Sequence, residues 1–577
     1  MSRAGSDRRV AIVGGGPAGL FLARMVRLRQ PEVAVDLYER KGIQDTFGFG
    51  VSLSDRTLHQ IVRNDPATHE RIVAASVGLA GVELRLPGGR VRYDGFGMSA
   101  ISRHALLEIL REQAEAVGAR LHFEHEPAAD ELVADVLALA DGATSTHRTA
   151  RQQAFGTSSH SGSARYIWLG TSAGFGDVVA FAFVHTEFGP MAAHCYPYTR
   201  DLSTVVIELD DSTWHNAGFD SAVLAGSAAG EIAPAALDLL AEVFADNLGG
   251  HRLISNRSKW GIFSVLSNQH WFDGNAVLLG DAAHTAHFTV GSGTKMALED
   301  AIGLANSLAE QPDRASAFAG YERLRRPAVT RTQRLAEPSM RWWETYGHRL
   351  HLPPAQFGLH FLTRTEAVSY LGLRRRSRDR VEEAERSYYH QAGAEPTTLN
   401  AIGAPLQLGE LSLANRLVSI EQPGSSAAGL QPIGNGLILQ DDPATPGELH
   451  GPGNVRFARL RCPHWPAPAA AADELVEQAI ALREKGFAAV LLTPAEPDPA
   501  AGWEEYLRQA SRIRTEAGVA VAVCVAEHWA LDLTRDADRD AWPTRIHLAL
   551  IAGRVDLVVA TGWQPNRNRP GSQLPAR

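Results

Sequence analysis

Hydrophobic and polar positions follow two periods along the chain, and the change of period separates strands from helices. Residues 10–13 form a short apolar run, residues 14–19 are rich in glycine, and residues 20–29 carry apolar side chains at helical spacing. A second run with strand character covers residues 33–39. This order predicts a βαβ unit with a parallel sheet at the N-terminus.

Period-two alternation is strongest in the middle of the chain. Residues 165–169, 178–185 and 202–209 read as strands of a separate, β-rich substrate sheet, after a Ser/Gly/His-rich stretch at 157–163 that we expect to be a loop. A helix is expected at 101–117.

Apolar periodicity returns in a strand at 276–279, followed by a glycine-interrupted loop, and helical patterns then continue to about residue 391. Residues 392–396 read as a domain boundary, because the chain beyond them is richer in Pro, Ala and Gly. The periodic segments of the last third suggest a piece of α/β architecture: helices at 471–485 and 503–517, and strands at 488–493, 519–525 and 555–560.

Composition narrows the class of partner. The net charge of −9 gives no basic footprint for nucleic acid, and no stretch approaches the roughly 20 apolar residues that span a bilayer. The three cysteines are too scattered for a disulfide framework or a metal site. We therefore expect a cytoplasmic protein that acts on a small molecule, with neither a nucleic acid nor a membrane as partner.

The segment Gly14-Gly15-Gly16-Pro17-Ala18-Gly19 fits the dinucleotide fingerprint GxGxxG. Gly14, Gly16 and Gly19, with Ala18, permit a tight turn, a close approach of backbone to pyrophosphate, and packing of helix on strand. Glu39 ends the next strand, where a carboxylate accepts hydrogen bonds from the adenosine ribose. A purely structural turn and a solvated strand-end acid are the alternatives.

A second motif, Gly280-Asp281 followed by Gly291, Gly293 and Thr294, comes after the strand at 276–279. It resembles the second FAD motif of the para-hydroxybenzoate hydroxylase-like flavoprotein monooxygenases. The resemblance implies that Asp281 binds the ribityl chain of FAD and that Gly291, Gly293 and Thr294 face the isoalloxazine ring.

Other segments fit the same family. Arg103, with leucines at 106 and 110, resembles the helix whose arginine contacts FAD, and Arg40, Gly50 and Val51 are included among the cofactor-binding residues. Asp141-Gly142 with Arg148 resembles a further family motif, which we interpret as mainly structural.

Phe288 stands where the family usually has proline. With the segments 47–51, 166–171 and 351–357, it makes residues 8–391 similar to salicylyl-CoA 5-hydroxylases and 2-aminobenzoyl-CoA monooxygenase/reductases; the tryptophan-pathway hydroxylase of violacein biosynthesis shares several of these features. The family implies that NADH or NADPH reduces FAD and that dioxygen then hydroxylates an electron-rich ring.

Candidates for the substrate pocket are His194 and Tyr196 on a substrate-sheet strand. His287 and Phe288 are further candidates, because they lie between Asp281 and the flavin-facing turn that begins at Gly291. His287 suits a hydrogen bond to a ring substituent. His194 and Tyr196 have an even alternative as satisfied sheet residues, and we interpret His284 as structural. The chemistry requires no metal.

Residues 405–417 resemble the opening of old yellow enzyme-type FMN reductases. A complete barrel of that type needs about 250 residues, more than the chain has left. We therefore expect residues 397–577 to form a truncated, degenerate TIM-barrel-like domain without FMN. Its expected role is structural or interfacial, such as homodimerisation or docking of a tethered substrate.

The sequence thus predicts a Rossmann-like α/β FAD domain (about 8–156 and 270–340) with an interleaved substrate sheet (157–269) and a helical segment (341–391). The leading hypothesis is hydroxylation of an aminobenzoyl or hydroxybenzoyl thioester carried on CoA or a carrier protein. Arginines between residues 374 and 380 could meet phosphates of that carrier, although a solvated helix face is the preferred interpretation. The alternatives are hydroxylation of a free indole or other arene in secondary metabolism, and a non-catalytic flavin-binding partner protein.

Overall fold

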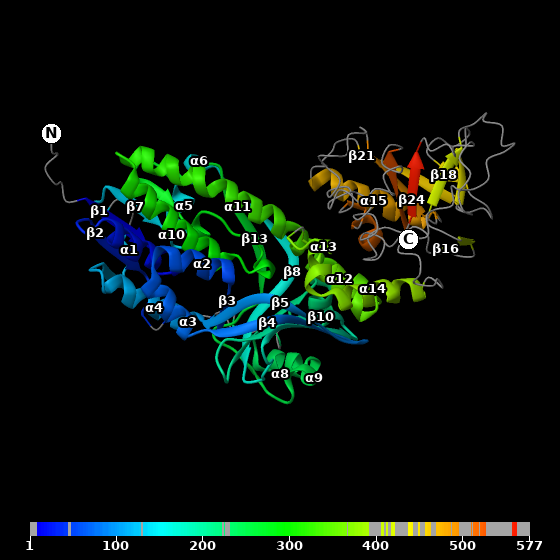
Figure 1. Ribbon diagram of the computed structural model, residues 1–577, viewed down its shortest axis with the longest axis horizontal. Coiled ribbons are helices and arrows are strands. Elements are labelled where there is room, and N and C mark those ends of the chain that lie inside the picture. The colour runs from blue at the N-terminus through cyan, green and yellow to red at the C-terminus, as the bar shows by residue number, and fades with distance from the viewer. Residues whose placement is uncertain are drawn as a thin grey trace. The chain divides into compact units, whose positions relative to one another are not determined.

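The computed structural model divides the chain into two compact units, residues 1–347 and 348–577 (Figure 1). It describes residues 8–391 apart from 44, 46–47, 128–130, 222–223, 225–230 and 366, and beyond 391 only the elements named below and a few residues beside them. The boundary predicted at 392–396 lies outside the described residues and stays a prediction.

The first sheet of unit 1 has six strands in the order β14-β15-β7-β1-β2-β6, and all neighbours are parallel except β14 and β15. This confirms the predicted βαβ unit. The fingerprint strand β1 lies between β2 and β7, so its carboxyl end opens at the centre of the sheet, where parallel α/β sheets bind ligands. The elements are β1 (Arg9–Val13), α1 (Pro17–Arg29), β2 (Ala34–Glu39), β6 (Arg120–Phe123), β7 (Val136–Leu139), β14 (Phe272–Asp273) and β15 (Ala276–Leu278).

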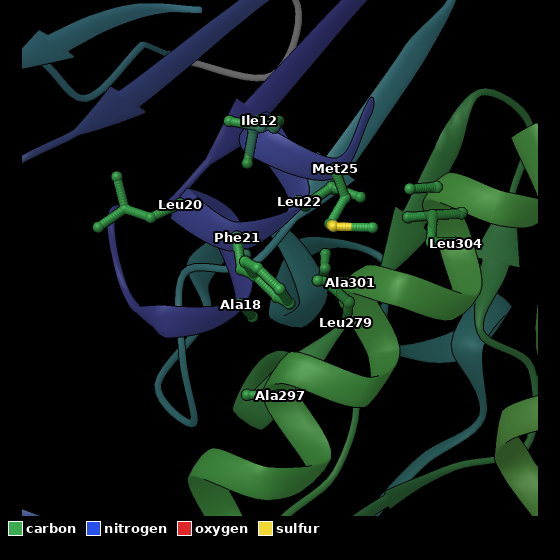
Figure 2. Packing of buried hydrophobic residues seen from close by; sticks show 14 of the residues in the cluster. Ile12, Ala18, Leu20, Phe21, Leu22, Met25, Leu279, Ala297, Ala301 and Leu304 are labelled. Atoms are coloured by element: carbon green, nitrogen blue, oxygen red, sulfur yellow. The ribbon is translucent and has the colours of Figure 1, made fainter. Parts of the chain in front are cut away.

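Helix α1 packs against α10 (Gly293–Glu310), which follows the second flavin motif. Figure 2 shows Phe21 and Met25 of α1 beside Ala301 and Leu304 of α10, all fully buried. Burying a side chain such as Phe or Met stabilises the fold by about 1.5–3 kcal/mol. The alanine on α10 keeps the two helices close, and this packing connects the two motifs, which are far apart in the sequence.

The second sheet has nine strands in the order β12-β8-β11-β10-β9-β4-β5-β3, with β13 also paired to β8. It includes strands from residues 50–102 as well as from the range 157–269 assigned to it above. The strands are β3 (Gly50–Ser54), β4 (Val77–Leu86), β5 (Gly89–Ser102), β8 (Thr157–Thr171), β9 (Val178–Thr186), β10 (Gly189–Pro197), β11 (Ser203–Leu209), β12 (Leu253–Ile254) and β13 (Gly261–Asn268).

The loop expected at 157–163 is wrong, because these residues form the first half of β8. Their hydroxyls pair across the strand gap with β13: Ser158 and Ser267 oxygens lie 2.9 Å apart, and Ser161 and Ser264 oxygens 2.7 Å apart. Such cross-strand pairs stabilise a sheet, although the residue types taken alone indicate a loop.

The two faces of the second sheet differ. Ile167, Cys195 and Ile207 point into an apolar core that also contains residues of α8 (Pro234–Val243) and α9 (Ala245–Leu248). Because side chains alternate along a strand, Tyr166 and Glu208 lie on the opposite face.

The remaining helices of unit 1 are α2 (Asp55–Asn64), α3 (Pro66–Ala74), α4 (Arg103–Glu115), α5 (Thr146–Ala150), α6 (Gln152–Phe155), α7 (Asp211–Asn216) and α11 (Arg314–Thr345), with 3-10 turns η1 (Gly280–Ala282), η2 (Phe288–Val290) and η3 (Tyr346–Arg349), the last crossing the boundary between the units.

Unit 2 begins with helices α12 (Pro354–Leu362), α13 (Tyr370–Arg376) and α14 (Arg378–Gln391). Seven later strands close into a barrel, in which β20 is antiparallel to both of its neighbours and the other pairs are parallel. The later elements are a hairpin of β16 (Leu406–Leu408) and β17 (Leu411–Leu413), then β18 (Leu417–Glu421), β19 (Leu437–Asp441), β20 (Glu448–His450), β21 (Arg456–Cys462), α15 (Ala469–Glu484), β22 (Ala489–Pro494), a π-helical turn (Ile513–Ala517), β23 (Ala520–Ala526) and β24 (Leu557–Thr561).

The helix predicted at 471–485 and the last three predicted strands are confirmed by α15, β22, β23 and β24. Of the helix predicted at 503–517, residues 503–508 and 511 lie outside the described residues, and the described remainder is helical, ending in the π-helical turn. Within the part of the chain that the structure describes, no helix combines the length and the hydropathy needed to cross a membrane.

Candidate active site

The turn after β1 is shaped by close backbone packing at Gly14. Its φ is +109°, and a Cβ there would lie 2.3 Å from the carbonyl oxygen of Ala140. The Gly14 amide donates to the Tyr38 carbonyl at 2.8 Å. A Cβ at Gly19 would in turn lie 2.0 Å from the Gly14 carbonyl oxygen. Only glycine satisfies both positions, so the fingerprint is built into the backbone.

Gly16 is different, because a Cβ there would meet no protein atom within 4 Å. It caps α1, whose first-turn amides and dipole point into this open space and favour a phosphate. Glu39 is fastened beside the turn, accepting from the amides of Gly15 at 2.6 Å and Lys41 at 2.9 Å. Arg40 is exposed and lies 3.6 Å from the Glu126 carboxylate.

The second flavin motif packs directly on the first. Gly280 has a φ of +60°, and a Cβ there would lie 2.8 Å from the Cβ of Ala18. The chain then passes through η1 and η2 to Gly291, after which α10 begins at Gly293, with half-buried Thr294 in its first turn. The N-termini of α1 and α10 therefore belong to motifs that touch each other.

We call the space around Asp281, which Arg103 and His284 adjoin, the flavin recess. Asp281 and Gly291 are exposed, yet protein atoms surround the Asp281 carboxyl closely enough for burial to raise its pKa, against the opposing charges of His284 and Arg103. Burial also lowers the pKa of Arg103, and the Asp281 charge opposes that shift. This recess, with two helix N-termini and the open side of Gly16, fits FAD: Asp281 and Arg103 would hold its polar chain, and α1 its phosphates.

Gly50 and Val51 begin strand β3 of the second sheet, and Gly50 is hydrogen-bonded to two side chains of that sheet. The Gly50 amide donates to the Thr204 hydroxyl, and its carbonyl accepts from the Tyr196 phenol, both at 2.8 Å. Burial raises the pKa of Tyr196 to about 12. The Tyr196 hydroxyl therefore has a structural partner in β3, while Val51 packs against the main core of the unit.

A buried charge network supports the second motif from behind. Asp300 accepts from the Gly280 amide at 3.1 Å and from Arg325 at 2.9 Å, and one carboxylate oxygen lies 2.7 Å from His284 Nε2. Burial alone would raise the pKa of Asp300, but His284 and Arg325 lower it below its usual range. Asp300 and His284 thus fix the backbone that presents Asp281.

Two of the predicted pocket residues meet at a carboxylate that the sequence analysis did not single out. Glu208 lies 3.2 Å from His194 Nε2 and 3.6 Å from His287 Nε2, and all three side chains are buried. His287 Nδ1 lies 2.8 Å from the Thr289 hydroxyl, which is hydrogen-bonded to Ser339 of α11.

Aromatic rings enclose this cluster. The Phe288 ring lies 4.5 Å from His287, 4.9 Å from Tyr166 and 5.8 Å from His194, measured between ring centroids. Trp343 of α11 lies 4.1 Å from His194. Tyr166 and Phe288 are half-buried, so part of each ring is open to a ligand, whereas the Glu208 carboxylate and the two imidazoles are buried behind them.

Tyr166 connects the two ends of the site. Burial raises its pKa, and the charges of Glu208 and Asp281 raise it further. The phenol is therefore neutral near pH 7 and lies between the recess and the histidine cluster. The sequence signal for Glu208 is its position as the one charged residue in the apolar strand Ser203–Leu209.

Two other motifs have structural roles. Arg148 donates to the carbonyls of Ala143 at 2.6 Å and Ala282 at 3.2 Å, which ties the Asp141-Gly142 segment to the second flavin motif. Arg378 and Arg380 pair with glutamates of α14 at 2.7 and 2.8 Å, as expected of a solvated helix face. Phe47 lies outside the described residues.

The chain resembles known proteins in sequence over most of its length. The FAD binding domain family matches residues 93–336. Salicyloyl-CoA 5-hydroxylase from Streptomyces sp is 38% identical over 455 residues, which are 76% of this chain and 86% of that protein. The chain belongs to the FAD-dependent aromatic monooxygenase family. This flavoprotein is therefore an enzyme, which sets aside the alternative of a non-catalytic flavin-binding protein.

Two other relatives extend the comparison. The 3-hydroxy-4-methyl-anthranilyl-(aryl-carrier protein) 5-monooxygenase of Streptosporangium sibiricum is 36% identical, over 58% of this chain and 89% of its own. The protodeoxyviolaceinate monooxygenase of Chromobacterium violaceum is 28% identical, over 62% of this chain and 95% of its own.

A solved structure shares the fold. A mutant of 2-methyl-3-hydroxypyridine-5-carboxylic acid oxygenase superposes with a TM-score of 0.50 at 19% identity, covering 62% of this chain and 97% of its own. The mixed α/β fold with its FAD-binding sheet and curled second sheet is thus that of FAD-dependent hydroxylases.

Proposed function

We propose that this monooxygenase hydroxylates a hydroxybenzoyl or aminobenzoyl group carried as a thioester on CoA or on a carrier protein. The observation that carries the proposal is the 38% identity across 86% of salicyloyl-CoA 5-hydroxylase. A second relative is named for an anthranilyl group on an aryl-carrier protein. The half-buried rings of Tyr166 and Phe288, next to the flavin recess, suit a flat aromatic substrate.

In this account each part of the site has one task. Asp281, Arg103 and the N-termini of α1 and α10 hold FAD, which supplies oxygen activation when bound and reduced by NADH or NADPH. Phe288 and Tyr166 orient the ring and exclude water. His194 and His287 support these rings from behind, where both imidazoles face Glu208.

The test uses the FAD-loaded protein in air with NADH or NADPH. Salicyloyl-CoA, anthraniloyl-CoA, the same groups on a pantetheine carrier, and the free acids are supplied in parallel, and products are identified by mass. We expect a product with one added oxygen atom from a thioester and none from the free acids. Conversion of the free acids alone would reject the thioester assignment.

A second candidate is hydroxylation of a free indole or related arene. The coverage of 95% of the protodeoxyviolaceinate monooxygenase favours it. Adding indole-derived arenes to the same panel distinguishes the two candidates, because only the first requires the thioester.

Residues 397–577 are proposed to form a truncated, TIM-barrel-like relative of old yellow enzyme that binds no FMN. The seven-stranded barrel and its mostly parallel strands support this. The match to salicyloyl-CoA 5-hydroxylase covers a larger share of the chain than residues 1–391 make up, so it extends into this region. We propose a role in homodimerisation or in docking the carrier.

A further inference from the structure

The side chain of Glu208 is an unusual feature of an otherwise apolar strand. It is 1% exposed, and its two carboxylate oxygens lie 3.2 Å from His194 Nε2 and 3.6 Å from His287 Nε2. A buried carboxylate is costly unless its surroundings compensate the charge. The residues that surround Glu208 come from β10 and from the segment before η2, so long-range folding assembles the cluster.

Strand register places this cluster on the substrate side of the sheet. Glu208 pairs directly with Tyr166 of β8, while the adjacent residues Ile167 and Ile207 point into the apolar core on the other face. Tyr166 and Phe288 are half-buried, and Glu208, His194 and His287 are buried. The site is therefore layered, with the phenol at the pocket surface and the carboxylate behind it.

Hydrogen bonding fixes the orientation of His287. A carboxylate near Nε2 favours the tautomer that carries its proton there, which leaves Nδ1 to accept from the Thr289 hydroxyl at 2.8 Å. Thr289 in turn can accept from Ser339, 2.8 Å away. These hydrogen bonds connect α11 to His287, and the Glu208 carboxylate, 3.6 Å away, favours a proton on the ring nitrogen that faces it.

A glycine on the neighbouring strand β13 leaves space around the Tyr166 phenol. Gly261 of β13 pairs with Tyr166, and a Cβ at residue 261 would lie 3.3 Å from the phenol ring and 3.4 Å from its oxygen. A larger residue would press on the ring. Glycine leaves the phenol able to meet a ligand.

From this geometry we infer that Tyr166 binds a hydroxyl or amino substituent of the substrate ring, and that Glu208 is the positioning residue that holds His194 and His287 around it. This inference depends on the proposed function, and it restricts the substrates within that function. It requires a ring bearing a hydrogen-bonding substituent, and an unsubstituted benzoyl ring would lack the partner.

The experiment measures ligand binding to the oxidised FAD-loaded protein by the change in flavin absorbance. The ligands are two matched pairs, salicyloyl-CoA with benzoyl-CoA and salicylate with benzoate. The variants are Tyr166→Phe and Glu208→Gln, with Tyr38→Phe as the control, since Tyr38 is also half-buried but stacks on His122 at 4.8 Å in the first sheet.

We expect the wild type and Tyr38→Phe to bind the hydroxylated member of each pair more tightly than the other member. In Tyr166→Phe and Glu208→Gln the ratio of the two affinities should fall about tenfold. Both variants should still bind FAD. Equal weakening of both members, an unchanged preference, or no preference in wild type would overturn the inference. Tyr166→Phe keeps the test decisive if Glu208→Gln does not fold. If the proposed thioester function is wrong, the result is different: the wild-type protein still binds salicylate in preference to benzoate, but it hydroxylates no thioester.

Discussion

At the scale of single residues, neighbouring glycines of the fingerprint do different work. Gly14 is required by the protein itself, because its backbone conformation and the Ala140 carbonyl leave no room for a side chain. Gly16 has an ordinary φ of −76° and faces open space. The sequence motif predicts a tight turn and a close approach of backbone to pyrophosphate; Gly14 provides the turn, and the open side of Gly16 suits the close approach.

Substituting these two glycines tests this difference. We expect Gly14→Ala to destabilise even the FAD-free protein by more than about 2 kcal/mol, since it forces strain and overpacking together. Gly16→Ala should leave the melting temperature of the FAD-free protein nearly unchanged but weaken FAD binding at least about tenfold, because the methyl group enters the space beside the phosphates. Thermal melts with and without FAD measure both. Equal melting temperatures for the two FAD-free variants would contradict this difference.

Site residues could be predicted where the residues of a motif are close together in the sequence, and could not be predicted where folding brings distant residues together. The two flavin motifs could be found in the sequence because each is a contiguous turn. Glu208 escaped because its neighbours His194 and His287 are brought to it by sheet pairing and by the loop before η2. One glutamate in an apolar strand was the available signal.

At the scale of elements, the turn η1 with the residues after it and helices α10 and α11 act together around Asp300. The Gly280 amide, His284 and Arg325 all converge on this carboxylate. The arrangement explains why His284, which the sequence left as structural, is placed within the second flavin motif. The position of Asp281 then depends on a charge that belongs to another element.

We expect Asp300→Asn to destabilise the protein by about 1.5–3 kcal/mol at pH 7, because the buried Arg325 would lose one of its two carboxylate partners while keeping Glu299 at 2.9 Å. The pKa of Asp300 is lowered from its ordinary value of 3.8, so its stabilisation is present above that value and is lost as the pH falls through the folded-state pKa. The stability difference between wild type and variant should therefore shrink in acid. Urea unfolding at several pH values measures it, and a difference that grows toward low pH would be the wrong sign.

Trp343 near the end of α11 covers the substrate face of the sheet. It is fully buried, stacks on Phe183 at 5.6 Å and lies 4.1 Å from His194. Trp343→Ala should cost about 3–5 kcal/mol and weaken aromatic ligand binding, whereas Trp343→Phe should keep most of both. Ligand titration and melting curves check this; normal binding by the alanine variant would show that the ring does not support the pocket.

Element prediction from sequence was accurate for the parallel sheet and the C-terminal strands, where apolar runs mark buried strands. It failed at 157–163, because serine hydroxyls pair across β8 and β13 and tertiary pairing outweighs the turn preference of the residues. The second sheet also includes β3, β4 and β5, whose non-local pairing has no local signal.

At the scale of the whole molecule, unit 1 carries both flavin motifs and the aromatic pocket, and unit 2 carries a barrel. If the barrel lacks FMN, flavin released by denaturation should be about one FAD per chain, with no FMN, after expression in flavin-rich medium. Chromatography of the released flavins gives the ratio. One FMN per chain would show that the barrel is a second redox site.

The proposed reaction is the hydroxylation of a hydroxy- or aminobenzoyl thioester by this enzyme. Its most direct test is the product mass after reaction of FAD-loaded protein, NADH or NADPH, and salicyloyl-CoA or anthraniloyl-CoA under isotopically labelled dioxygen. We expect one labelled oxygen atom in the aryl group, with the thioester intact. Oxidation of the nicotinamide cofactor with no labelled oxygen in either thioester would contradict it.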